Sequence, residues 1–178
     1  VTLNTSDLTH YQNFYDSLEH RLCFFPQYYC FILSLALDLE ALGLGQGKSA
    51  KLCQWVVDHN LVGAELSDLQ RAEAVRLLKR GLGRAQQDDP ALVDLLHGFI
   101  DQSATFSIPN KKAAYELTHI IFYLSVYGRK DPGISTDAVR SFEFAGLLAL
   151  LDHNTDLLAE ICTALRFAGQ TPPLGWED

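Results

Sequence analysis

Apolar residues recur every three to four positions along almost the whole chain, and no convincing stretch alternates apolar and polar residues as a half-buried strand would. This spacing predicts an all-α fold built from antiparallel helical hairpins that bury their apolar sides. About eight helices are predicted, near residues 6–24, 26–42, 48–60, 67–82, 89–102, 110–127, 136–152 and 155–168. The short connections favour a bundle or a partial α/α toroid.

Residues with known capping preferences stand at several of these predicted ends. Ser67 and Gln70 form a capping box, Pro90 suits the first turn of a helix, and Pro109-Asn110 precedes the helix that starts near residue 110. Four helices are expected to stop at a glycine, namely Gly43, Gly81, Gly128 and Gly169.

The length of 178 residues fits one all-α domain covering residues 1–178. The chain starts at Val1 and contains no Met, so Val1 is not an unprocessed translation start. We therefore leave open that this sequence is processed or is the C-terminal part of a longer chain.

Charge and hydropathy exclude two classes of partner. The formal net charge of −8 argues against nucleic acid and anionic membranes, because both need a basic surface. The longest uncharged run, residues 22–37, has 16 residues and contains Pro26, which is too short to cross a bilayer. We therefore expect no nucleic-acid binding and no membrane insertion.

The four cysteines indicate a reducing compartment. Cys23, Cys30, Cys53 and Cys162 lie among apolar neighbours and form no CxxC pair, so we interpret them as buried free thiols. Such thiols are typical of cytoplasmic proteins, and we predict a cytoplasmic location.

One predicted helix combines apolar residues on nearly every side with an acid and an imidazole. At about 100° per residue, Glu116, His119, Tyr123 and Tyr127 fall within one arc of roughly 80° on the helix at 110–127. A helix so poor in polar surface is expected inside the fold, where an unpaired Glu or His costs several kcal/mol. We therefore expect a hydrogen-bonded network in which Glu116 accepts from His119, a tyrosine hydroxyl or Arg129.

Glu116 and His119 also have the spacing of the acid-x-x-His pairs in carboxylate-bridged di-iron bundles. One pair supplies only half of such a site, so we predict no bound metal. The loop at residues 43–49 ends in Gly-Lys-Ser, but Leu42 occupies the position where a phosphate-binding loop needs its first glycine. We predict no cofactor.

A short sequence recurs in the two halves. Asp58-His59-Asn60 is matched by Asp152-His153-Asn154, 94 residues later, and each follows an apolar helix. Asn and His suit a helix C-terminus, so capping explains both copies. Alternatively, an internal duplication would bring helix ends to one mouth, where Asp152, His153 and Asp156 meet His119 or Arg129.

Two stretches carry a resemblance to a family. The sequence Glu-Leu-Thr-His-x-x-Phe-Tyr-Leu-Ser-x-Tyr-Gly at 116–128, followed by Asp-Leu-Leu-Ala-Glu at 156–160, is similar to uncharacterised bacterial all-α domains, as is Phe-Phe-Pro-Gln-Tyr-Tyr at 24–29. The resemblance covers most of the chain and implies helical architecture and a bacterial source. It implies no known activity and no catalytic residues.

Two functional hypotheses remain. The preferred one is a non-catalytic helical domain that binds a protein partner or a small ligand, with homo-oligomerisation left open. Its candidate ligand-binding residues are Glu116, His119, Tyr123, Arg129, Asp152, His153 and Asp156. The alternative is a small metal-dependent or acid–base enzyme that uses the Glu116/His119 pair, with its catalytic residues otherwise unknown.

Overall fold

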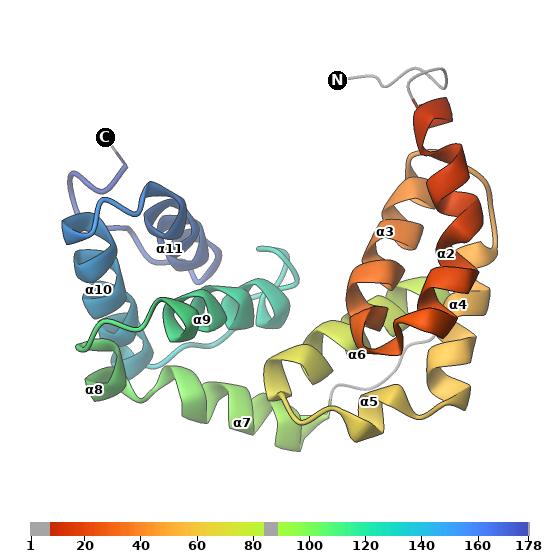
Figure 1. The fold of residues 1–178 in the computed structure, drawn as a ribbon. Helices are drawn as coiled ribbons and strands as arrows, with labels where there is room; N and C mark the ends of the chain where they lie inside the picture. Colours follow the sequence, from red (N-terminus) through yellow and green to blue (C-terminus); the bar gives the residue numbers. More distant parts are fainter. Residues whose placement is uncertain (1–7, 84–88, 178) are drawn as a thin grey trace. The chain divides into compact units, whose positions relative to one another are not determined.

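The computed structural model describes residues 8–83 and 89–177, and within these ranges the chain is all-α, without a strand (Figure 1). Two 3-10 helices, η1 and η2, accompany the α-helices. In chain order the elements are η1 (Thr9–Tyr11), α2 (Gln12–Phe24), η2 (Pro26–Tyr28), α3 (Tyr29–Ala41), α4 (Lys48–Asp58), α5 (Leu61–Ala64), α6 (Asp68–Leu82), α7 (Pro90–Ile100), α8 (Ser103–Phe106), α9 (Lys111–Leu124), α10 (Thr136–Leu151) and α11 (Thr155–Phe167). The all-α prediction is confirmed, while a bundle or toroid arrangement stays a prediction. Across the described ranges, no helix is long and apolar enough to cross a bilayer.

The chain divides into two compact units, Val1–Gln87 and Asp88–Asp178. In the first unit, α2 and α3 form a hairpin through η2, and α3 packs against α2, α4 and α6 (Figure 1). The central helix is α3 because apolar residues occupy most of its circumference, so Leu33 and Ala36 are fully buried. The prediction of one domain for residues 1–178 stays a prediction.

A carboxylate near the end of α3 fixes the turn into α4. Glu40 accepts hydrogen bonds from the Tyr15 hydroxyl (2.6 Å), the Ser49 backbone N–H (2.9 Å) and the Ser49 hydroxyl (2.5 Å). It therefore supplies the cap that the N-terminus of α4 lacks from its own N-cap residue, Gly47. Gly45 makes this turn possible, since its φ is +81° and the Tyr15 ring lies 2.7 Å from where a Cβ would be.

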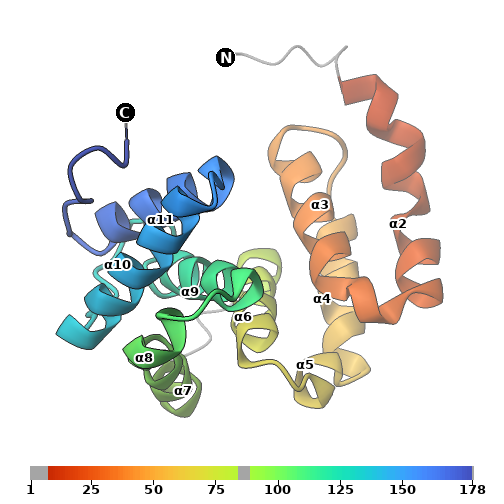
Figure 2. The same cartoon turned by 60° about the vertical axis from the view of Figure 1, so that its left-hand side comes forward.

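In the second unit, α11 packs against α9 and α10, and α10 also packs against α7 and α8 (Figure 2). The Ser141 hydroxyl of α10 donates to the Ile100 carbonyl at the end of α7 over 2.6 Å. After α11 the chain turns back, and the Trp176 ring occupies the space where a Cβ on Gly146 would lie. Arg166 on α11 pairs with Glu177 and holds this tail in place.

Three of the predicted helix starts are confirmed, whereas the stop predicted at Gly128 is wrong because α9 ends at Leu124. The side chains of Ser67, Asp89 and Asn110 each accept a hydrogen bond from a backbone N–H in the first turn of the following helix. Gly81 does not end a helix, because α6 continues to Leu82 and Gly83 adopts the left-handed conformation instead. Gly81 has another role, since the Cys53 sulfur fills the space where its Cβ would be.

The order of helices gives the internal duplication no support. Matching the two Asp-His-Asn turns pairs α4 with α10, and the offset of 94 residues then places the first part of α9 opposite the end of α2. However, α3 lies between α2 and α4, whereas the described residues between α9 and α10 form no helix. The central helix of the first unit therefore has no counterpart at that place in the second.

Candidate functional site

The acid and imidazole of α9 lie together on a side of the helix that reaches solvent. The side chains of Glu116 and His119 are 32% and 41% exposed, whereas Leu117, Ile120 and Ile121 on the other side are buried. The helices packed against α9, which include α11 and α7, leave the side with Glu116 and His119 partly open. The prediction of a helix enclosed on all sides is therefore wrong.

Glu116 and His119 pair with different groups. A Glu116 carboxylate oxygen lies 3.9 Å from the Lys112 ammonium, one turn earlier on the same helix. His119 Nε2 lies 3.7 Å from Glu160 Oε2 on α11, and that same oxygen accepts a hydrogen bond from the Thr118 hydroxyl over 2.7 Å. These contacts replace the predicted network in which Glu116 accepts from His119, a tyrosine or Arg129.

The aromatic residues that follow His119 stay in ring contact although α9 ends among them, with the Tyr123 and Tyr127 centroids 6.3 Å apart. Tyr123 remains on the helix, and its ring centroid lies 6.2 Å from that of His119. The helix ends at Leu124, and Tyr127 then has a φ of +56°, so it leaves the arc predicted for it. Arg129 lies beyond this turn and is exposed. The helix predicted at 110–127 is therefore too long at its C-terminal end, because Val126 and Tyr127 continue the apolar pattern but lie outside the helix.

Asp156 pairs with an α9 side chain that the sequence did not single out. The Tyr115 hydroxyl donates to an Asp156 carboxylate oxygen over 2.8 Å. This hydrogen bond to a carboxylate raises the pKa of Tyr115, because losing the phenolic proton would place two negative charges together. The contact joins the first turns of α9 and α11, with Asp156 at the helix end where a negative charge is favourable.

The two Asp-His-Asn turns both follow helices, but the residue with the left-handed conformation differs by one position between them. After α4 the left-handed residue is Asn60, with a φ of +49°. After α10 it is His153, with a φ of +52°, and Asn154 then caps α11 by accepting from the Leu157 N–H. Capping therefore explains the positions of both sequences.

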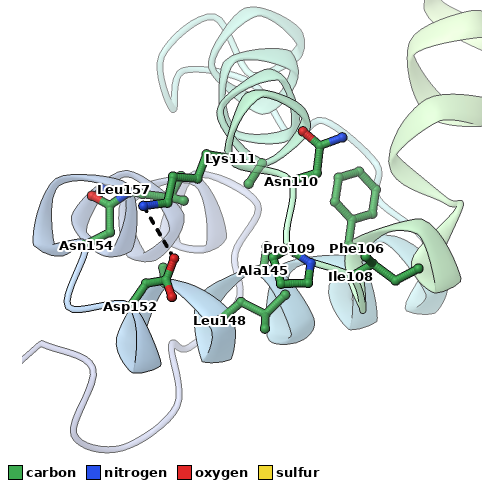
Figure 3. Close-up of a pocket in the computed structure, with 12 residues that line it drawn as sticks. Phe106, Ile108, Pro109, Asn110, Lys111, Ala145, Leu148, Asp152, Asn154 and Leu157 are labelled. Carbon is green, nitrogen blue, oxygen red and sulfur yellow. Dashed lines mark hydrogen bonds and ion pairs between the residues drawn. The ribbon is translucent and has the colours of Figure 1, made fainter.

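Asp152 lies at the edge of a hollow in the second unit, between α9, α10, α11 and the segment that joins α8 to α9 (Figure 3). The hollow holds about 370 Å³ of empty space, part of it open to solvent. Its apolar wall consists of Phe106, Ile108, Ala114, Ala145, Leu148 and Leu157. Because these residues come from four separate segments, the sequence offered no pattern that would group them.

Polar groups form the edge of the hollow. The Lys111 ammonium lies 3.4 Å from an Asp152 carboxylate oxygen, as the dashed line in Figure 3 marks. Each charge opposes the dipole of its own helix, since Lys111 begins α9 and Asp152 follows α10. Across the ion pair, however, the Lys111 ammonium meets the negative C-terminal end of α10, and the Asp152 carboxylate meets the positive N-terminal end of α9. Asn110 and Asn154, which cap α9 and α11, complete this polar edge.

Of the predicted residues, only Asp152 lines the hollow. The predicted meeting of Asp152, His153 and Asp156 with His119 or Arg129 is replaced by the pairs Lys111–Asp152, Tyr115–Asp156 and His119–Glu160. Throughout residues 8–83 and 89–177, the structure brings together no group of three or more His, Cys, Asp or Glu side chains that would hold a metal ion.

Comparison with known proteins assigns the chain to a family. Neither the search of curated proteins nor that of solved structures produced a match. Residues 1–178 match the family described as "Domain of unknown function (DUF6902)", and this full-length match shows that the chain belongs to that family.

Proposed function

We propose that the protein is a non-catalytic binding domain, and that the hollow of its Asp88–Asp178 unit receives an apolar side chain from a protein partner. The observation that carries this proposal is the apolar wall of the hollow, which stays partly open to solvent. Burying one Leu-sized side chain there contributes roughly 1.5–3 kcal/mol. The separate pairing of Glu116 and His119 leaves the alternative of a Glu116/His119 acid–base pair without support.

The surroundings of the hollow favour a protein over a small ligand. Leu151 and Leu147 lie about 60° and 100° around α10 from Leu148, and both are exposed. Ile108, on the opposite wall, is exposed as well. The apolar surface therefore continues beyond the hollow, and a partner helix with several apolar residues would cover more of it than a small molecule held inside.

Charge indicates the chemistry of that partner. The Asp88–Asp178 unit contains six Lys or Arg and 13 Asp or Glu, a formal charge of −7. Glu143 precedes Leu147 by one turn of α10, Asp152 follows that helix beside Lys111, and Asp156 lies in the first turn of α11. We therefore infer that the partner segment is a basic amphipathic helix, with leucine-like residues facing the hollow and Lys or Arg at its margins.

The setting of this function is part of the proposal. Burial raises the pKa of the Cys30 and Cys53 thiols, to about 12 and about 11, which keeps them protonated and poorly reactive. Buried free thiols of this kind support a cytoplasmic location, whereas the bacterial source rests on the family resemblance alone.

The proposal can be tested with a synthetic peptide of about 15 residues that carries leucines at helical spacing and lysines elsewhere. Titration into ¹⁵N-labelled protein, followed by two-dimensional amide NMR, should shift the amide signals of Ala114, Ala149 and Leu157. We expect saturation with a Kd on the order of 100 µM, because one inserted side chain and a few surface charges supply the free energy.

Matched controls separate insertion from charge attraction. A peptide with alanines in place of the leucines keeps the charge and should leave the amides of the hollow unshifted. Leu151→Asp should weaken binding at least about tenfold, whereas Leu174→Asp, at a fully exposed residue outside the hollow, should not. Equal shifts with both peptides, or shifts located away from the hollow, would show that the proposal is wrong.

A further inference from the structure

Four aromatic side chains of the first unit lie on its surface where α2 turns into α3. Phe24, Phe25, Tyr28 and Phe31, here called the aromatic face, are 67%, 42%, 57% and 64% exposed. Large aromatic side chains are normally among the most buried in a fold. Four of them at one turn therefore need a physical explanation.

The aromatic face is an organised cluster. The Phe24 and Phe25 rings meet edge to face at 4.5 Å between centroids, and the Tyr28 ring lies 5.9 Å from that of Phe25. Phe31 follows Tyr28 by three residues, near the start of α3, which places it close to the same side of the turn. His20, one turn before Phe24 on α2, extends the cluster by stacking on that ring.

The exposed area of this cluster is large for a monomer. Full burial of a large aromatic side chain removes roughly 150–250 Å² from water, so the four exposed fractions leave about 450 Å² of aromatic surface on one chain. This estimate lies within the range of about 300–600 Å² typical of the largest apolar patch on a monomer, a patch that often serves in binding.

We propose that the aromatic face joins two copies of this chain in a two-fold symmetric dimer. Two such faces bury about 900 Å² from the rings alone. The polar residues of α2 and η2 around the cluster bring the total towards the roughly 1,200–2,000 Å² of a stable interface. In a two-fold symmetric dimer each chain contributes the same patch to the interface, so the single aromatic cluster on each chain is enough to form it.

Charge favours self-association through this unit. The Val1–Gln87 unit contains eight Lys or Arg and nine Asp or Glu, so two copies of it meet almost without net repulsion. Arg21 lies about 60° around α2 from Phe24, whereas Glu19 lies about 140° away, so no concentration of one sign of charge on α2 opposes the pairing. Because the unit has no excess of positive charge, electrostatic attraction does not favour an anionic membrane as the partner of this face.

The test is the mass of the full chain in solution, measured by sedimentation equilibrium across nanomolar to high micromolar concentrations. The wild-type chain should reach twice the 19.9 kDa of the monomer, with dissociation on the order of micromolar. Phe24→Ser and Phe31→Ser should each weaken the dimer about 30-fold or more. Leu66→Ser, at a 98% exposed residue of the same unit, should leave it unchanged.

Far-UV circular dichroism checks that each variant stays helical, and wild-type dilution provides a reading that needs no variant. A mass of 19.9 kDa at every concentration would overturn the proposal, as would a dimer that survives both Phe substitutions. A monomer that binds uncharged phosphatidylcholine vesicles through Phe24 would also overturn it and assign the face to a lipid surface. None of these outcomes depends on the hollow of the other unit.

Discussion

Replacing Glu40 with alanine should be one of the most destabilising single changes to a polar residue in the first unit. Its carboxylate receives three hydrogen bonds, two from Ser49 and one from Tyr15, and both donor residues are at least nine-tenths buried. A hydrogen bond to a charged group contributes roughly 1.5–3 kcal/mol, and a buried donor left unpaired costs about 1–3 kcal/mol. Because the three bonds share one carboxylate, their energies overlap. We expect a loss of about 3–5 kcal/mol of unfolding free energy.

Urea unfolding followed by far-UV circular dichroism measures this loss directly, as a lower midpoint at an unchanged slope. Glu19→Ala, at an exposed residue of α2, is the matched control and should change stability by less than about 0.5 kcal/mol. A loss below about 1 kcal/mol for Glu40→Ala would refute the view that this carboxylate fixes the turn into α4.

The same group gives stability a pH dependence of defined sign. Burial by itself would raise the pKa of Glu40, but the hydrogen bonds from Ser49 and Tyr15 outweigh it and lower that pKa below the ordinary 4.5. A carboxyl group whose folded pKa is depressed adds stability that is present above its unfolded pKa and lost as the pH falls through the folded value. Wild-type stability should therefore decline below about pH 4.5 more steeply than that of Glu40→Ala.

Three further predictions concern other groups. Burial, and then the Glu40 carboxylate, raise the pKa of Tyr15 from 10.0 to about 12. As the pH rises between these values, the wild-type chain should lose on the order of 2–3 kcal/mol of unfolding free energy, measured by urea unfolding. Tyr15→Phe has no phenolic proton to lose and should not show this decline. Cys23 is exposed, so the prediction of a buried thiol is wrong for this residue, and Ellman's reagent should modify it rapidly and the three buried thiols only after unfolding. Rapid modification in Cys23→Ser would contradict this. Gly146→Ala should displace Trp176 and shift its fluorescence to longer wavelength in a Trp55→Phe background, because a Cβ would occupy the space of that ring. An unshifted emission would show that the tail does not lie against α10.

The helix ends could be predicted from the sequence because they depend on neighbouring residues. Ser67, Asp89 and Asn110 cap helices through backbone groups two or three residues away, and such patterns are visible in the chain itself. The helix end predicted at Gly81 is wrong because the role of this glycine depends on a residue far away in the sequence. That glycine is needed for a close contact with Cys53, 28 positions earlier, and not for a turn.

The candidate site was harder to predict because it depends on which surfaces the fold covers. An apolar helix pattern at residues 110–127 indicated burial, yet the helices packed against α9, which include α7 and α11, leave His119 41% exposed. Its partner Glu160 lies 41 positions later, and no local spacing links the two residues. The same holds for Tyr15 and Glu40, whose hydrogen bond spans 25 positions.

The two proposed surfaces have different consequences for binding, which makes their combination testable. A dimer formed through the aromatic face carries two hollows, so a partner with two basic amphipathic segments would engage the second at a high effective concentration. Its apparent affinity should exceed that for a single segment by about a hundredfold where the linker spans both sites. Phe24→Ser should remove this gain and leave single-segment binding unchanged, because Phe24 lies outside the Asp88–Asp178 unit that contains the hollow. Leu151→Asp should weaken both kinds of binding and leave the dimer intact.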